Sequence, residues 1–97
     1  MGRYDRKLNL DDAEAIALSG LAFLAEDETR LGRFLALTGI GPGELRSSAG
    51  SAGTLSAVLD YLLGDESLLL VFAASKGISP DVVAPARSVL AANIIAK

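Results

Sequence analysis

Apolar residues recur along this chain at the three- and four-residue spacing of helices, in segments that glycine and proline separate. The spacing is plainest in one segment, whose apolar positions are Leu55, Val58, Leu59, Leu62 and Leu63. Helices are predicted at about residues 13–25, 28–38, 42–49, 54–63, 66–76 and 85–97. The pattern therefore predicts an all-α fold, a compact bundle of five to six short helices.

One stretch of this pattern occurs twice. Residues 27–42 and 65–80 share Asp, Glu, Leu, Phe, Ala, Gly, Ile and Pro at positions 38 apart. Further matches upstream are Leu21 with Leu59 and Leu24 with Leu62. Two interpretations stay open: an internal duplication giving two pseudo-repeated halves, or two helices that acquired similar caps independently. In a compact bundle, Phe34 and Phe72 are expected at similar core positions.

Helix starts and stops account for about half of these matches. Asp27 and Asp65 are expected to cap the helices that follow them. Gly39 and Gly77 are expected to end those helices in the left-handed conformation, and the isoleucine after each would complete a Schellman motif.

The first and last helices carry less regular signals. Asp11 is expected to cap the first helix, with Glu14 placed as in a capping box. Ser19 and Gly20 weaken its middle and would let a neighbouring helix come close. Pro85 is expected to break the last segment, giving a turn at 80–84 and the main helix after it.

The burial expected for each helix follows from its polar positions. The helix at 28–38 should turn Leu31, Phe34, Leu35 and Leu37 inward and Arg30 and Arg33 outward. Glu26 and Arg30, four residues apart, would form a solvated surface pair. The leucine-rich helix at 66–76 has so few polar positions that it is expected to be buried.

The ends and loops complete the predicted organisation. Residues 1–9 are expected to form a flexible basic tail and residues 10–97 a single helical domain. The stretch 50–53 is the predicted loose loop. The basic start makes a poor signal peptide, and the longest apolar run, seven residues at 68–74, is too short to cross a bilayer. A cytoplasmic protein without a membrane partner is expected.

Composition and charge narrow the chemistry. The chain has no His and no Cys, which excludes imidazole and thiolate ligands and thiol nucleophiles. The acids at 11–14 and 26–28 coincide with helix starts, where capping explains them. No catalytic constellation and no cofactor site is predicted. The net charge of −3 is opposite to that of most nucleic-acid-binding proteins.

One spacing nevertheless matches a nucleic-acid-binding motif. Ala73, Gly77 and Val83 fit a helix-turn-helix, with a small residue, a turn glycine and an apolar anchor. The second helix would present Arg87, Ser88 and Asn93, but it opens with an acid and has little positive charge for phosphates. A tight helical corner needs the same spacing.

Two sets of residues carry a resemblance to a known family. They are Ala13–Leu18, Phe23–Ala25, Arg33–Leu35 and Thr38–Pro42, and then Val58–Leu63, Asp65–Glu66 and Leu69–Ala73. Over about residues 10–85 the chain resembles a family of small bacterial helical proteins of unknown function. The resemblance implies an all-helical fold in a bacterial cytoplasm and supplies no catalytic residue.

These observations favour a non-catalytic protein-interaction module that binds a second copy of itself or another protein. Its support is an excess of apolar residues for so small a domain. The expected interaction surface comprises Arg30, Arg33, Arg46, Tyr61, Arg87, Ile94 and Ile95. The alternative is a helix-turn-helix-like nucleic-acid-binding adaptor.

Overall fold

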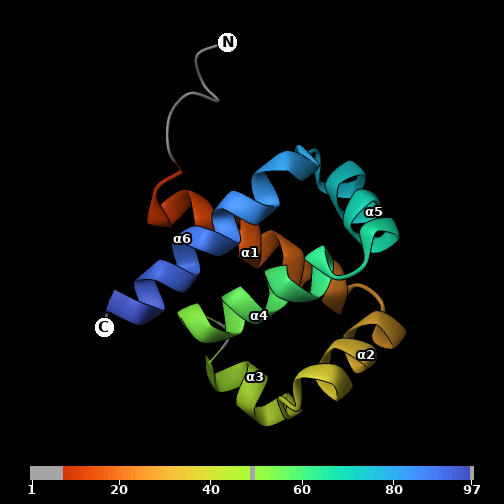
Figure 1. Cartoon of the computed structure of the whole chain (residues 1–97). Coiled ribbons are helices and arrows are strands. Elements are labelled where there is room, and N and C mark those ends of the chain that lie inside the picture. Colours follow the sequence, from red (N-terminus) through yellow and green to blue (C-terminus); the bar gives the residue numbers. More distant parts are fainter. Residues whose placement is uncertain (1–7, 49, 97) are drawn as a thin grey trace.

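Six α-helices and one 3₁₀ turn make up the part of the chain that the structure describes (Figure 1). This computed structural model describes residues 8–48 and 50–96, the last two without their side chains. The elements are α1 (Leu10–Ala25), α2 (Glu28–Thr38), α3 (Pro42–Ser48), α4 (Ala52–Leu63), α5 (Glu66–Lys76), η2 (Pro80–Val82) and α6 (Val83–Ala96). The predicted all-α bundle is confirmed.

Helices α1 and α4 cross at the centre, and α6 packs across both (Figure 1). Helix α2 contacts α1 and α4, and α5 contacts the same two helices. The largest fully buried side chains are Phe23, Phe34, Phe72, Leu24, Leu55, Leu59, Leu62, Leu90, Val58 and Val83. These side chains come from all the helices except α3, so they form one core rather than two.

The crossing of α1 and α4 depends on Gly20. A Cβ atom at this position would lie 3.0 Å from a methyl carbon of Val58 and 3.0 Å from one of Leu62. Carbon atoms pack at about 3.5–4.0 Å, so any larger side chain at this position would have to push Val58 and Leu62 away. The expectation that a neighbouring helix approaches at Gly20 is confirmed.

Helix α1 begins earlier than its sequence suggested. Asn9, not Asp11, is its N-cap: the Asn9 side-chain oxygen accepts the Asp12 backbone N–H at 2.7 Å. The Asp12 carboxylate accepts the Asn9 N–H at 3.2 Å, which completes a capping box. Leu8 packs against the core. Residues 8 and 9 of the expected tail thus take part in the fold, and residues 1–7 lie outside the described part.

Two helix starts were identified correctly from the sequence. Asp27 caps α2 by accepting N–H groups of the first turn, and Asp65 caps α5 in the same way. Both glycines at the ends of these helices have positive φ, 75° at Gly39 and 66° at Gly77. The predicted left-handed stops are therefore confirmed.

Only the second of the two stops is a Schellman motif. The Ile78 N–H donates to the Ala73 carbonyl at 2.9 Å, as that motif requires. After Gly39, the Ile40 N–H instead donates to the Thr38 hydroxyl at 3.3 Å. That hydroxyl itself donates to the Phe34 carbonyl at 2.8 Å. The Thr38 hydroxyl thus accepts the N–H that a Schellman motif would direct to a backbone carbonyl.

Two further boundaries differ from the predictions. Ser51, placed in the loose loop, is the N-cap of α4, so that helix begins at Ala52. Pro85 does not break the last helix, because α6 begins at Val83 and the proline lies in its first turn. The N–H groups of a first turn have no partner within the helix, so a proline there costs no hydrogen bond.

Two aromatic pairs connect the two halves of the repeat, α1 with α2 and α4 with α5, in a reciprocal way. Phe23 of α1 packs against Phe72 of α5, with ring centroids 5.5 Å apart. Tyr61 of α4 packs against Phe34 of α2 at 5.4 Å. Positions 23 and 61 are 38 residues apart, as are positions 34 and 72. Each half therefore places the aromatic residue of its second helix on the first helix of the other half.

We predict that Gly20→Val lowers the free energy of unfolding by about 1–3 kcal/mol, because the added methyl groups meet Val58 and Leu62 in a filled core. Urea unfolding followed by circular dichroism measures the change. Combining it with Val58→Ala should recover part of the loss, since the shorter side chain vacates the same space. An unchanged unfolding midpoint for the single variant would contradict the close crossing.

A second prediction compares two glycines in exposed positions. Gly77→Ala should lower stability by about 1–2 kcal/mol, because alanine is strained at positive φ. Gly32→Ala, within α2 and with nothing within 4 Å of the new methyl group, should raise stability by about 0.5–1 kcal/mol. Thermal unfolding of both variants tests the opposite signs. Equal shifts would show that the left-handed stop is unimportant.

Candidate interaction groove

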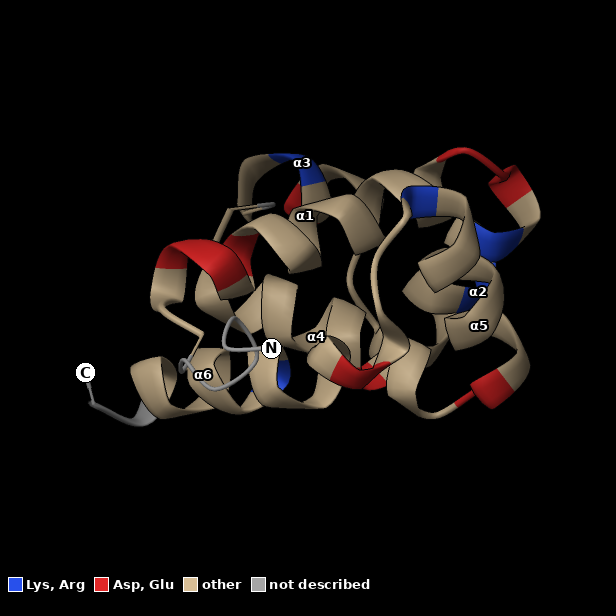
Figure 2. Ribbon diagram, turned by 90° about the horizontal axis from the view of Figure 1, so that it is seen from above, with Lys and Arg blue, Asp and Glu red and all other residues tan. Residues whose placement is uncertain are grey.

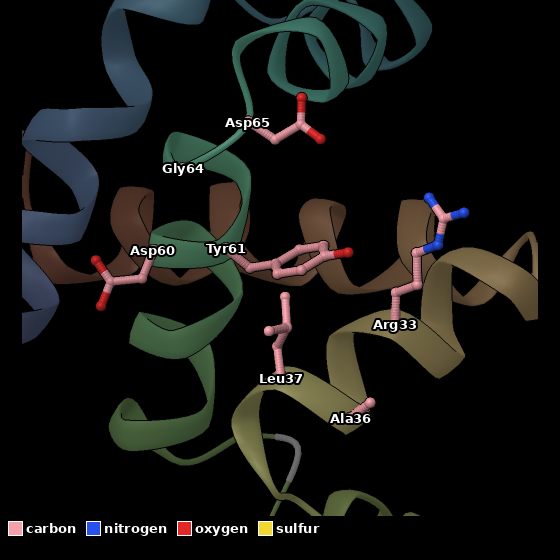
Figure 3. Close-up of a pocket in the computed structure, with 7 residues that line it drawn as sticks. All are labelled: Arg33, Ala36, Leu37, Asp60, Tyr61, Gly64 and Asp65. Atoms are coloured by element: carbon pink, nitrogen blue, oxygen red, sulfur yellow. The ribbon is translucent and has the colours of Figure 1, made fainter.

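An open groove of about 570 Å³ lies between α2 and the junction of α4 with α5 (Figure 3). The residues that line it are Arg33, Ala36, Leu37, Asp60, Tyr61, Gly64 and Asp65. Leu37 points toward the ring of Tyr61 (Figure 3). The groove thus has an apolar centre with charged residues at its edges.

The helical period of α2 forms one wall. Arg33, Ala36 and Leu37 lie three and four residues apart, so they share one face of the helix. Phe34 points the other way and is fully buried. Its ring packs edge-on against Tyr61, and this contact holds the tyrosine at the floor of the groove.

The opposite wall is formed where α4 ends and α5 begins. Gly64 contributes no side chain there, and Tyr61 lines the groove next to it (Figure 3). Asp65 caps α5 by accepting the Leu68 N–H at 3.1 Å through one carboxylate oxygen, Oδ1. Its hydrogen bonds within the described residues use only that oxygen, so the other oxygen is available to a partner.

Asp60 lines the edge of the groove but is engaged elsewhere. Its carboxylate points away from Tyr61 (Figure 3) and accepts from Arg87 Nε at 2.6 Å and from Nη2 at 3.3 Å. The hydrogen bond and the charge of Asp60 raise the pKa of the Arg87 guanidinium above its ordinary value. This exposed pair therefore joins α4 to α6 and leaves Asp65 as the acidic group facing the groove.

The groove combines charged and apolar groups. It brings together a guanidinium and a carboxylate at its edges and a tyrosine ring at its floor. Among the described residues, no three acids lie close enough together to hold a metal ion. The groups present can form ion pairs, hydrogen bonds and apolar contacts with another molecule.

Two of the residues expected at an interaction surface, Arg33 and Tyr61, meet in this groove. Arg30 does not. Its guanidinium lies 4.2 Å above the centre of the Phe23 ring and donates to the Phe23 carbonyl at 3.4 Å. Arg30 thus fixes α2 to the end of α1. The expected Glu26–Arg30 pair is also absent, because Glu26 pairs with Lys76 at 2.5 Å.

The remaining expected residues are spread over other helices. Arg46 lies exposed on α3, and Arg87 is paired on α6. Ile94, near the end of α6, is 41% exposed, and the side chain of Ile95 lies outside the described part. The basic positions of α2 and α5 lie at one end of the bundle, and those of α3 and α6 lie apart from them (Figure 2).

Sequence reasoning missed the exposed leucine of the groove. Leu37 was expected to point inward, but its side chain is 76% exposed. It follows Arg33 by four residues, so the outward direction assigned to Arg33 could have placed Leu37 on the same face. Gly64 and Asp65 were recognised only as a stop and a cap.

Other apolar side chains are exposed outside the groove. Helix α5 is not buried all round, since Leu70 and Val71 are each 49% exposed. Leu18 is exposed on α1 although that helix contacts four others. The core has room for one face of each helix, and the apolar positions on the opposite face remain in water.

The expected helix-turn-helix residues form a tight corner. Helices α5 and α6 meet there at a bend of 113°. Val83 at the start of α6 is buried, and the exposed face of that helix carries Ala84, Pro85 and Ser88.

No single helix of the described residues is long and apolar enough to cross a membrane. Helices α5 and α6 are long and apolar enough only when they are counted together, and they are sharply bent relative to each other.

Comparisons with known proteins give one match. No curated protein and no solved structure matches the chain. A family model described as a protein of unknown function, DUF3572, matches residues 10–93, from the start of α1 into the last part of α6. The expected resemblance to an uncharacterised helical family is confirmed, and the chain belongs to the DUF3572 family.

Proposed function

We propose that this protein is a non-catalytic interaction module that docks a protein through the groove between α2 and the α4–α5 junction. The observation that supports the proposal best is Leu37, whose side chain is 76% exposed beside the ring of Tyr61. Burying a leucine side chain of this kind contributes about 1.5–3 kcal/mol. A partner that covers the groove would gain this contribution.

The composition of the groove favours a protein over a small substrate. Protein interfaces have an apolar centre surrounded by polar groups, and tyrosine and arginine often dominate their binding energy. Here Leu37 and Tyr61 form the centre, and Arg33 and Asp65 lie at the edges. The open shape exposes these groups along a surface, as contact with another folded chain requires.

The nucleic-acid-binding alternative gains no support from the described surface. Arg87, the basic residue of its expected recognition helix, is paired with Asp60. Phosphate binding needs several unpaired cations on one face, and Lys76 of α5 is likewise paired, with Glu26. This alternative, like the bacterial cytoplasmic setting, stays a prediction from the sequence.

The repeated stretch is best explained by an internal duplication. The ends of α1 and α4, the starts of α2 and α5, and their left-handed stops all lie 38 residues apart. Independent acquisition of caps accounts for similar starts and stops. It does not account for the reciprocal pairs of Phe23 with Phe72 and Tyr61 with Phe34. We therefore include a duplicated helical pair in the proposal.

Photo-crosslinking in the cell of origin tests the docking proposal. A photoreactive phenylalanine replaces Leu37 in the full chain, and a matched variant carries it in place of Leu70, which is exposed on α5 outside the groove. We expect a crosslinked protein from position 37 and much less from position 70. Mass spectrometry of the crosslinked band identifies the partner, whether a second copy or another protein.

The same experiment can also refute the docking proposal. Both variants must first show the helical circular dichroism of the unmodified chain. If a folded variant gives no protein crosslink from position 37, or equal crosslinks from both positions, the groove is not the docking site.

A further inference from the structure

The groove has a counterpart at the other end of the bundle. Shifting its lining residues by 38 positions leads to the junction of α1 with α2 and to the facing side of α5. Tyr61 corresponds to Phe23, Asp65 to Asp27 and Gly64 to Glu26. The two aromatic residues occupy equivalent places, because each packs against the buried phenylalanine of the helix facing it.

At the junction of α1 with α2, two contacts within the chain cover the place that corresponds to the groove. Lys76 at the end of α5 reaches Glu26 at the end of α1 and forms an ion pair. Arg30 covers the face of the Phe23 ring with its guanidinium. These contacts place charged groups of both signs over an aromatic floor.

The groove lacks both of these contacts because of three substitutions between the halves. Gly64 stands where the first junction has Glu26, so no carboxylate is available there. Thr38 stands in the place of Lys76, and its hydroxyl is bound to the backbone of its own helix. Leu68 replaces Arg30 and packs against the core. The ion pair and the cation–ring contact of the α1–α2 junction thus have no equivalent at the groove.

We infer that a second copy of this chain supplies the missing contacts, in a two-fold symmetric dimer centred on the groove. The inference rests on the proposed docking function and names its partner. In such an interface the same surface serves both copies, so it must be complementary to itself. The groove meets this condition, because one wall carries the cation Arg33 and the other the carboxylate Asp65.

The symmetry dictates which groups meet. A two-fold axis that runs along the groove through its centre places the α2 wall of each copy over the α4–α5 wall of the other. Each Arg33 then faces Asp65 of the other copy, and the two Leu37 side chains meet the Tyr61 rings near the axis. The charge pairing resembles that of Lys76 with Glu26 at the closed junction, now made between chains.

Sedimentation equilibrium of the purified full chain, from about 1 µM to about 1 mM, tests the dimer over the range of weak to moderate affinities. We expect reversible dimerisation that weakens with added salt. Leu37→Asp should weaken it at least about 10-fold, because it places two like charges at the centre. Leu70→Asp, an equally apolar-to-acidic change outside the groove, should leave it unchanged.

A mixing experiment tests the specific ion pair. Arg33→Glu alone places its new carboxylate opposite Asp65 of the other copy, and Asp65→Lys alone places its new ammonium group opposite Arg33. Each variant should therefore remain monomeric by itself. In an equimolar mixture both contacts become attractive, and a heterodimer should form. Circular dichroism first verifies that Asp65→Lys folds, since it also removes the cap of α5.

Three results would overturn the dimer: a monomer at all concentrations, equal weakening by the two aspartate variants, or no association in the mixture. The crosslinking experiment separates this failure from that of the docking function. A monomer that crosslinks from position 37 to a different protein refutes only the second copy. A monomer without any crosslink refutes both.

Discussion

The rest of the fold depends on the close contact of α1 with α4 at Gly20. Because no side chain separates the helices there, their axes approach far enough for α6 to pack across both. The same crossing determines where α2 and α5 lie, since each follows directly from one central helix and packs against the other. The groove is a consequence of this arrangement, at the place where α2 passes the end of α4.

Local signals in the sequence were sufficient for the order of the helices and most of their ends. Asp27, Asp65, Gly39 and Gly77 act within one turn of their own positions, so their roles follow from residue type and spacing. Where a backbone N–H had two possible acceptors nearby, the sequence did not indicate which one it uses. The Ile40 N–H bonds to the hydroxyl of Thr38 rather than to the helix carbonyl that a Schellman motif would use.

The candidate site was predictable only in part, because it depends on residues distant in sequence. Arg33 and Tyr61 were identified as surface residues, but nothing local indicates that α2 and α4 bring them together. The pairing of Lys76 with Glu26 spans 50 positions and left Arg30 to stack on Phe23. The outward direction of Leu37 likewise follows from which face of α2 the bundle could cover.

The reciprocal aromatic pairs have a consequence for how the chain unfolds. Phe34 completes its packing on α4, and Phe72 completes its packing on α1, so neither helical pair contains the partner of its own phenylalanine. A half released from the other would expose a large apolar ring and lose its share of the core. The two halves therefore hold each other in the native state and unfold together as a single cooperative unit.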